Sequence, residues 1–433
     1  MIELQKKGGR MFDFREEMNR FIEKCTACGE CVAVCPIIPM TDIKTADSSE
    51  VMQAVVDLYR SAKVSDMAKT RIYSCMRCQT CRPACPEDLD PGLGITMARD
   101  VLGQKGEPLP RGLSFLLPEA DFNFMKAIEA VQITPAERAW ITDVEKQKPA
   151  SARTVVFSGC TGIMQPDLVL TALDMIRRFD PTVQALGGVD YCCGDTNLRA
   201  GNHQLATNNF VDLVDGLNAF SPQTVVFLCP TCNDFFDLHQ PETNWTWRFV
   251  ADFLADHLDE LGPFEPLEAS VTIHDACHLV RGDKPGSESP RKLLNAVPGI
   301  RIVEMQHNRE KALCCGGSAM AAIGKPGVDF RTQRLQQAEQ TGAQIMTLYC
   351  TGCQSVFSPE RAHWPFQVES MLTLLGRSLG IVHEDQLMRY FNYQDGQKVL
   401  REIEARLAEA ELPPEKLKHF VPKYFAGPAV KKR

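Results

Sequence analysis

Hydrophobic residues in the N-terminal part of the chain recur at the spacing of an α-helix. Asp47 and Glu50 form a capping box, and apolar side chains then fall on one face of the segment that follows. This pattern predicts an amphipathic helix with a short continuation through Met67. The sequence GLGITMARDVLG predicts another helix that ends near Gly103. We therefore expect a mainly helical N-terminal domain.

From about residue 150 the pattern changes, and short β-branched runs alternate with helical segments. The arrangement occurs twice, about 120 residues apart, as in an internal repeat. Strands that alternate with helices of about 10–15 residues favour βαβ units and a mostly parallel sheet. The repeat therefore predicts two α/β lobes related by a pseudo-twofold axis. The matching segments are TVVFSGC at 154–160 with VTIHDAC at 271–277, and TVVFLCPTCNDFF at 224–236 with IMTLYCTGCQSVF at 345–357.

Proline and glycine clusters, together with the repeat, predict an α+β chain of several domains. A boundary is expected near Pro149. The tail KLKHFVPKYFAGPAVKKR is basic and is predicted to be a solvated, frayed terminus; the alternative is a docking segment for another protein of a complex. The predicted parts are a helical domain (1–103), a connector (104–149), a first lobe (150–265), a second lobe (266–380), and a C-terminal helical extension with the basic tail (381–433).

Composition and charge exclude several classes of protein. The 433 residues are 44% hydrophobic and 24% charged, as in ordinary globular proteins. The net charge of −8 argues against nucleic acid as the main partner, since phosphate binding favours a basic balance. No apolar stretch reaches the roughly 18 residues of a membrane span, and the N-terminus lacks the apolar region of a secretory signal. A cytoplasmic protein is therefore expected.

All 18 cysteines fall into patterns that indicate metal ligation and not disulfides. A chain of this length can bury a core without disulfides, and repeated C-x-x-C spacings are typical of metal sites. Two runs match C-x2-C-x2-C-x3-C-P, in which the fourth cysteine of each run ligates the other cluster of a two-cluster ferredoxin. The pattern therefore predicts two [4Fe–4S] cubanes in a ferredoxin-type domain. Their ligands are Cys25, Cys28, Cys31 and Cys85 for one cubane, and Cys75, Cys78, Cys81 and Cys35 for the other.

Zinc is the alternative occupant of these two runs. Zinc also accepts four thiolates, but its sites are built from two C-x-x-C pairs without a third regularly spaced cysteine. The runs therefore favour cubanes. Because cubanes carry one electron at a time and this domain has no apparent substrate site, we expect it to conduct electrons.

The other ten cysteines form two matched sets of five, one in each repeat. Five ligands are one too many for a cubane, and the side chains of two adjacent cysteines diverge, so that they suit two irons of one larger cluster. Gly194 and Gly316 follow the pairs, and glycine lets the backbone approach an inorganic core closely. The alternative, that these are small buried core residues, does not account for the repetition. The sets are Cys160, Cys192, Cys193, Cys229 and Cys232, and Cys277, Cys314, Cys315, Cys350 and Cys353.

The motifs HDACHLVRG, CCGG and CxxC resemble the CCG domain of heterodisulfide reductases. The N-terminal half is similar to the two-cubane subunit of these enzymes, and the two occur here on one chain, as in the D subunit of the membrane-bound form. The resemblance covers roughly residues 20–380 and extends to the iron–sulfur subunits of glycolate, lactate and glycerol-3-phosphate dehydrogenases. It implies that each set of five cysteines binds a noncubane [4Fe–4S] cluster, and both sets are complete here.

The resemblance implies a catalytic iron–sulfur subunit of a heterodisulfide-reductase-like complex. Electrons would pass through the cubanes to the noncubane clusters, which would reduce a disulfide or trisulfide of a small molecule or protein. Cys193 and Cys315 are the candidate catalytic cysteines. His278 is a candidate proton donor, because a neutral imidazole near pH 7 suits proton delivery. The same argument applies less strongly to His274 and His307, which are weaker candidates for a proton donor.

The alternative function is a non-catalytic relay in a flavin dehydrogenase or a membrane quinone or cytochrome complex. The chain has no G-x-G-x-x-G and no P-loop, so a flavin would sit on another subunit. Both functions require a redox partner, and the resemblance implies a membrane cytochrome b or a flavoprotein. It also implies peripheral attachment to the inner face of the cytoplasmic membrane, in a complex of anaerobic respiration.

Overall fold

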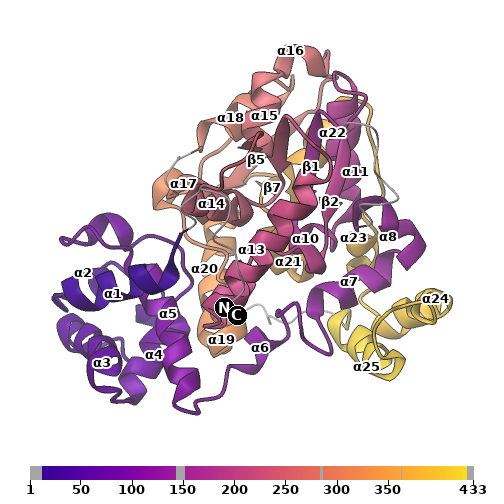
Figure 1. Ribbon diagram of the computed structural model, residues 1–433. Helices are drawn as coiled ribbons and strands as arrows, with labels where there is room; N and C mark the ends of the chain where they lie inside the picture. Colours follow the sequence, from indigo (N-terminus) through magenta and orange to yellow (C-terminus); the bar gives the residue numbers. More distant parts are fainter. Residues whose placement is uncertain (1–11, 143–151, 283–285, 362, 427–433) are drawn as a thin grey trace.

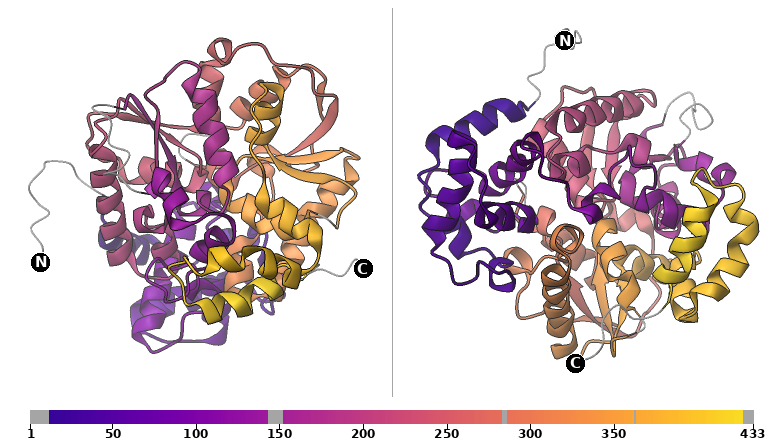
Figure 2. Two further views of the ribbon diagram at one scale, coloured as in Figure 1. Left: turned by 90° about the vertical axis from the view of Figure 1, so that its right-hand side faces the viewer. Right: turned by 90° about the horizontal axis from the view of Figure 1, so that it is seen from below.

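In the computed structural model, the described residues are 12–142, 152–282, 286–361 and 363–426. The chain forms a helical N-terminal domain, a central part with two β-sheets, and a C-terminal group of helices (Figure 1). The N-terminal domain and the C-terminal helices lie on opposite sides of the central part, which Figure 2 shows from two further directions. Within the described ranges, no helix is long and apolar enough to cross a membrane.

The N-terminal domain is mainly helical, as predicted. Asp47 accepts hydrogen bonds from the backbone of Ser49 and Glu50 and so begins α3. The predicted continuation through Met67 is wrong, because the backbone turns into a left-handed conformation at Ala62 and Ser65 caps a separate helix, α4. The elements are α1 (Phe14–Lys24), α2 (Glu30–Ala33), η1 (Ile38–Met40), α3 (Ser48–Ser61), α4 (Asp66–Ser74), η2 (Arg82–Ala84) and α5 (Pro91–Gln104).

The described part of the connector, up to residue 142, contains three helices that lead from the N-terminal domain towards the first sheet. They are α6 (Arg111–Ser114), α7 (Phe124–Gln132) and α8 (Pro135–Thr142). Helix α8 packs against β2 at the edge of that sheet. The domain boundary expected near Pro149 lies outside the described residues.

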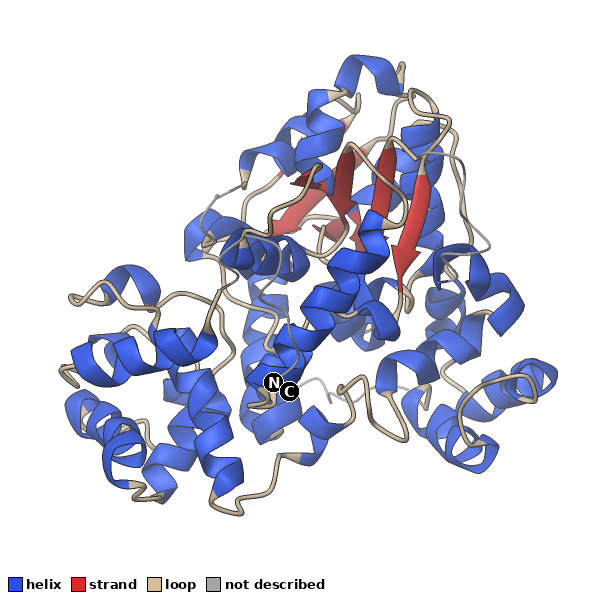
Figure 3. Cartoon of the chain, in the orientation of Figure 1, coloured by secondary structure: helices blue, strands red, loops and turns tan. Residues whose placement is uncertain are grey.

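The central part contains two four-stranded sheets with parallel pairing and the same strand order (Figure 3). This is the α/β arrangement predicted from the repeat. The inner strands β1 and β5 are almost fully buried, which is why they read as continuous apolar runs. The first sheet has the order β2-β1-β3-β4, with β1 (Thr154–Ser158), β2 (Gln184–Gly187), β3 (Thr224–Phe227) and β4 (Thr246–Phe249). The second has the order β6-β5-β7-β8, with β5 (Ala269–His274), β6 (Ile300–Ile302), β7 (Ile345–Leu348) and β8 (Gln367–Ser370).

Helices join the two repeats across the centre of the molecule. In each repeat, the helix that follows the C-x-x-C motif packs against the helix at the first cysteine of the other repeat: α21 against α10, and α14 against α17. The first repeat contains α10 (Gly159–Gly162), α11 (Pro166–Arg177), η3 (Val189–Tyr191), α12 (Asp195–Arg199), α13 (His203–Asn218), α14 (Pro230–His239), α15 (Val250–Asp256) and α16 (Leu258–Leu261). The second contains α17 (Cys277–Val280), α18 (Glu288–Asn295), η4 (Arg309–Lys311), α19 (Gly317–Ile323), α20 (Lys325–Gln340), α21 (Thr351–Phe357), η5 (Ser358–Glu360) and α22 (Met371–Ser378).

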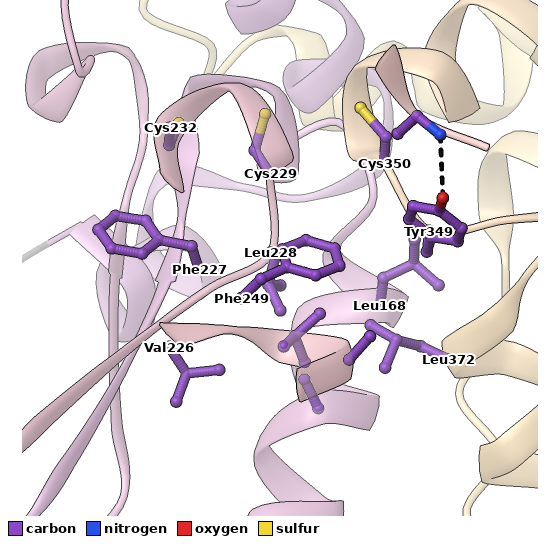
Figure 4. Packing of buried hydrophobic residues seen from close by; sticks show 14 of the residues in the cluster. Leu168, Val226, Phe227, Leu228, Cys229, Cys232, Phe249, Tyr349, Cys350 and Leu372 are labelled. Atoms are coloured by element: carbon purple, nitrogen blue, oxygen red, sulfur yellow. Dashed lines mark hydrogen bonds between the residues drawn. The ribbon is translucent and has the colours of Figure 1, made fainter. Parts of the chain in front are cut away.

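A single hydrophobic cluster extends through both sheets. The rings of Phe249, at the end of β4, and Tyr349, after β7, lie 6.0 Å apart between centroids. Figure 4 shows Phe227 and Phe249 from the first repeat and Leu372 from the second in one group of buried side chains. The two repeats are therefore packed as one body, and the cysteine-bearing loops at their ends are held in fixed relative positions.

The C-terminal helices are α23 (Gln386–Tyr393), α24 (Gly396–Leu407) and α25 (Pro414–Tyr424). The prediction of a frayed terminus is wrong for α25, because Leu417, Val421 and Phe425 are fully buried. These side chains belong to a cluster that also includes α7 and the side chains of Cys160 and Cys192. The extension therefore covers one side of the first repeat's cysteine site. Residues 427–433 of the basic tail lie outside the described residues.

Candidate iron–sulfur sites

The outer site is a small cavity at the end of the N-terminal domain. Its loop passes through left-handed backbone conformations at Ala27 and Gly29, which turn three cysteines of the first run toward one space. The side chain of Cys28 is exposed to solvent. Four cysteines line the cavity, three from the first run and one from the second: Cys25, Cys28, Cys31 and Cys85.

The inner site is a second small cavity, which lies deeper in the molecule. Its loop has the same backbone geometry as the loop of the outer site, with left-handed conformations at Arg77 and Gln79. Three cysteines of the second run and one of the first line this cavity: Cys35, Cys75, Cys78 and Cys81. The two cavities thus gather the cysteines in the two crossed sets that the sequence predicts, although the ligation itself remains a prediction.

The residues at both sites suit a cluster better than a single ion. Within the described ranges, no three histidine, cysteine or acidic side chains converge closely enough to hold one metal ion. The four thiols instead surround a space, as the ligands of a group of several atoms do. Thiolates are the soft ligands that iron–sulfur clusters require.

The crossed arrangement predicts the effect of one substitution. Replacing Cys85 with Ser is expected to damage the outer cluster and leave the inner one largely intact, because Cys85 lines only the outer of the two cavities. Low-temperature EPR of the reduced protein would measure both signals. The matched variant Cys35→Ser should have the opposite effect. Loss of the inner signal in Cys85→Ser would contradict crossed ligation and favour sequential quartets.

The first CCG site is formed by the five cysteines of the first repeat. Cys160 follows β1 and Cys229 follows β3, so both lie at the carboxyl ends of neighbouring parallel strands, where ligands of such sheets typically bind. The thiols form a connected group that runs from Cys160 through Cys192, Cys193 and Cys232 to Cys229. All five are buried.

The second CCG site has the same construction. Cys277 follows β5 and Cys350 follows β7. The sulfur atoms of Cys277 and Cys314 lie 4.0 Å apart. Cys315 interacts with Cys353, which in turn interacts with Cys350. The structure therefore brings together both sets of five cysteines.

The four sites follow one another in an order that the sequence does not give. Cys78 of the inner site interacts with Cys277 and Cys314 of the second CCG site. Cys350 of the second CCG site interacts directly with Cys229 of the first. Figure 4 shows Cys229 and Cys350 projecting to the same side, above the buried hydrophobic residues. The order is outer, inner, second CCG, first CCG, so the second repeat is the one adjacent to the N-terminal domain.

The glycines after the cysteine pairs have a packing role that the sequence argument missed. Gly194 and Gly316 have φ values of 101° and 78°, a region that L side chains rarely adopt. A Cβ at Gly194 would lie 2.2 Å from the backbone oxygen of Ala206. The glycine thus allows the cysteine loop to lie directly against helix α13.

A buried ionic network joins the inner loop to the first repeat. Asp195, at the start of α12, forms ion pairs with Arg77 of the inner loop and with Arg199 at the end of the same helix. Burial alone raises the pKa of Asp195, but Arg199 and Arg77 outweigh it and lower the pKa to about 2. Arg199 also donates to the backbone oxygen of Met76 at 2.7 Å. The loop that carries the inner site is therefore fixed by charge as well as by packing.

His278, the candidate proton donor, belongs to the same network. Its Nδ1 lies 2.7 Å from a carboxylate oxygen of Asp234, and Arg199 donates to its Nε2 at 3.1 Å. Gln79 of the inner loop donates to the same Asp234 oxygen at 2.8 Å. Both ring nitrogens of His278 are therefore engaged. The ring links the second repeat to the first and to the inner loop.

The other two histidines are held by the second repeat itself. Arg334 donates to Nδ1 of His274 at 3.0 Å, and the side chain of Gln337 lies 2.8 Å from Nδ1 of His307. Sequence reasoning did not identify the ionic network. One signal could have pointed to it. Asp195 and Arg199 correspond to Gly317 and Ala321 in the second repeat, so these two positions are charged only in the first repeat.

Two domain families match the chain. They are the 4Fe-4S dicluster domain over residues 21–89 and the cysteine-rich CCG domain over residues 271–358. The first range contains both N-terminal cysteine runs, and the second contains the whole second CCG site. Fold and sites thus define an iron–sulfur protein that joins a dicluster domain to cysteine-rich α/β repeats.

Several curated proteins are similar over much of the chain. The D subunit of the dihydromethanophenazine:CoB–CoM heterodisulfide reductase of Methanosarcina barkeri is 25% identical over 397 residues, which cover 83% of this chain and 94% of that protein. The B subunit of the fumarate reductase (CoM/CoB) of Methanothermobacter marburgensis is 25% identical over 349 residues, 76% of this chain and 66% of that protein. The probable iron–sulfur-binding oxidoreductase FadF of Bacillus subtilis is 27% identical over 174 residues, 39% and 24% respectively.

Proposed function

We propose that the chain is the electron-transfer and catalytic iron–sulfur subunit of a heterodisulfide-reductase-like complex. The observation that carries the proposal is the uninterrupted series of four cysteine sites. The series begins at the solvent-exposed Cys28 and ends where Cys229 and Cys350 meet. The proposed cofactors are cubane [4Fe–4S] clusters at the outer and inner sites and noncubane [4Fe–4S] clusters at the two CCG sites.

The proposed reaction is the reduction of a disulfide or trisulfide. Cleaving one S–S bond takes two electrons and two protons. A disulfide then releases two thiols, and a trisulfide releases one thiol and one persulfide. Bound clusters would supply one-electron carriers at the four sites. The contact between Cys229 and Cys350 places the two CCG sites side by side, so each can supply one electron to the same bond. Cys193 and Cys315 are the proposed catalytic cysteines because each belongs to one of these two sites.

His278 can act as a proton donor only if one of its two ring nitrogens becomes free. Asp234 orients the ring through Nδ1, and Arg199 occupies Nε2. His278 therefore releases or accepts a proton at Nε2 only when the Arg199 contact opens. We propose that its first role is to hold Cys277, its neighbour in sequence, in place.

The proposed partner delivers electrons at the outer site. The similarity to a heterodisulfide reductase subunit, over 94% of that protein, supports a redox partner in a shared complex. We propose a membrane cytochrome b or a flavoprotein, with peripheral attachment at the inner face of the cytoplasmic membrane. The substrate would then react at the far end of the series, away from this partner.

The second candidate function is a relay without disulfide chemistry. One observation favours it: the C-terminal helices and α7 cover the side of the first CCG site where Cys160 and Cys192 lie. A covered site suits electron transfer more than substrate access. In this case the electrons would continue to a flavin, quinone or cytochrome on another subunit.

The proposed cofactors predict the iron content. Four clusters correspond to about 16 irons per chain. Iron and zinc would be measured by elemental analysis of protein purified without oxygen. A value near eight would mean that the CCG sites hold something else, and substantial zinc would contradict the whole assignment.

Reaction with disulfides separates the two candidate functions. Reduced holoprotein would be mixed with a panel of small disulfides, trisulfides and quinone analogues, and its reoxidation followed by absorbance. The catalytic function predicts reoxidation by a disulfide with release of two thiols, or by a trisulfide with release of one thiol and one persulfide, per S–S bond cleaved. Reoxidation by a quinone analogue, without thiol release from any disulfide, would support the relay instead.

A further inference from the structure

Arg71 is a buried arginine between the inner and outer sites. It lies on α4 and is 1% exposed. One of its terminal nitrogens, Nη1, donates a hydrogen bond to the Sγ of Cys35 at 3.6 Å. The side chain also lines the inner cavity, and its Nε is buried without a partner among the described residues. The guanidinium therefore faces sulfur.

The charge of Arg71 is not balanced by a carboxylate. Within the described ranges, no Asp or Glu oxygen lies within 4.0 Å of its guanidinium, whereas the buried Arg77 and Arg331 pair with Asp195 and Glu360. Burying an unpaired charge is costly. The compensating charge must therefore come from the cysteine sites.

Besides Cys35, which accepts its hydrogen bond, three further cysteines interact electrostatically with this charge. Burial lowers the pKa of Arg71, but the thiolates of the surrounding cysteines outweigh this effect and raise it. Three of them belong to the inner site, namely Cys35, Cys75 and Cys81, and Cys31 belongs to the outer site. Arg71 is therefore closest to the inner site but also within electrostatic reach of the outer one.

We propose that Arg71 is a positioning residue that acts as the shared counter-cation of the two cubanes and sets their reduction potentials, the inner one more strongly. Each reduction adds one electron from the preceding carrier and neither forms nor breaks a bond. The added negative charge is stabilised by a fixed cation, and the stabilisation is larger in a buried site and at shorter distance. This inference rests on the proposed cubanes at the outer and inner sites.

Redox titration of the holoprotein, followed by EPR, tests the inference. In Arg71→Gln, the ratio of reduced to oxidised inner cubane at a fixed potential is expected to fall at least tenfold, which is about 59 mV in midpoint potential for one electron. The outer cubane should shift by less. Arg71→Lys keeps the charge and should restore most of the inner potential.

Arg60 provides the matched control. It lies on α3 in the same domain, its guanidinium is exposed, and it donates to the backbone oxygens of Ile22 and Cys25 beside the outer site. Arg60→Gln removes the same charge from a position that water and salt screen. Neither midpoint should change by more than about twofold in the reduced-to-oxidised ratio.

Three results would overturn the inference. The first is an unchanged inner midpoint in Arg71→Gln with full iron content. The second is an equal shift in Arg60→Gln. The third is loss of the inner cluster from both Arg71→Gln and Arg71→Lys, which would show a packing role and not a charge role. Absence of both cubane signals from the unaltered protein is a different result, and it would overturn the proposed function itself.

Discussion

Replacing Cys315 with alanine is expected to abolish cleavage of a disulfide substrate while the two N-terminal sites remain reducible. Cys315 is one of the adjacent pair in the second CCG site and interacts with Cys353 in the same site. Its loss removes one of five ligands. The outer and inner sites precede the second CCG site in the series, so electrons from a partner should still reach them.

A double substitution tests whether the two CCG sites act together on one S–S bond. If both CCG sites act on one S–S bond, Cys193→Ala should abolish turnover as Cys315→Ala does, and the double variant should lose no more than either single one. The control is Ser355→Ala on α21, where the hydroxyl donates to the backbone oxygen of Gly352 and to no cysteine. Cubane reduction and thiol release would be measured side by side in all variants. Full turnover in Cys315→Ala would eliminate the two-site mechanism and leave the relay.

Replacing Asp195 with alanine is expected to lower the free energy of unfolding by about 3–5 kcal/mol. The variant leaves Arg77 and Arg199 without their shared carboxylate, and the side chain of Arg77 is only 4% exposed. Uncompensated buried charge is the reason for the large effect. Chemical denaturation under anaerobic conditions, followed by circular dichroism, would measure it.

Asp190 offers the matched control for this experiment. Its carboxylate pairs with Lys126 at the surface, where its side chain is 74% exposed. Asp190→Ala should cost at most about 1 kcal/mol, as exposed ion pairs do. Iron content must be equal in the compared proteins, since a lost cluster would also destabilise the fold. An Asp195→Ala protein as stable as Asp190→Ala would show that the network does not hold the inner loop.

The parts of the fold that could be predicted from the sequence are those with local signals. The inner strands β1, β3, β5 and β7 are largely buried and read as apolar runs, and the repeat predicted a mostly parallel sheet. The outer strands were missed. Residues of β4 and β8 alternate between exposed and buried, and β6 has only three residues, so none forms a continuous apolar run. Their position in the sheet comes from pairing with an inner strand.

In the candidate sites, too, the local features could be predicted from the sequence and the long-range contacts could not. Cysteine spacing is local and indicates which side chains gather in each loop. The ionic network is not local, because Arg77 and Asp195 are 118 residues apart in the sequence. The order of the four sites depends on how α14 meets α17 and α21 meets α10, which no spacing encodes. The tail was predicted to be frayed because it is rich in basic residues, and the apolar face of α25 among them was not recognised.

The burial of the inner loop bears on how the protein is assembled in the cell. Arg99, Arg199 and Arg281 hold the backbone of this loop through the oxygens of Cys75, Met76 and Cys78. Cys28 of the outer site is exposed, whereas the cysteines of the inner and CCG sites are buried or half-buried. We therefore expect the proposed clusters at these three sites to be inserted before the N-terminal helices dock onto the repeats. Dissolved oxygen would then reach the proposed outer cluster first, because Cys28 is the exposed cysteine of the series.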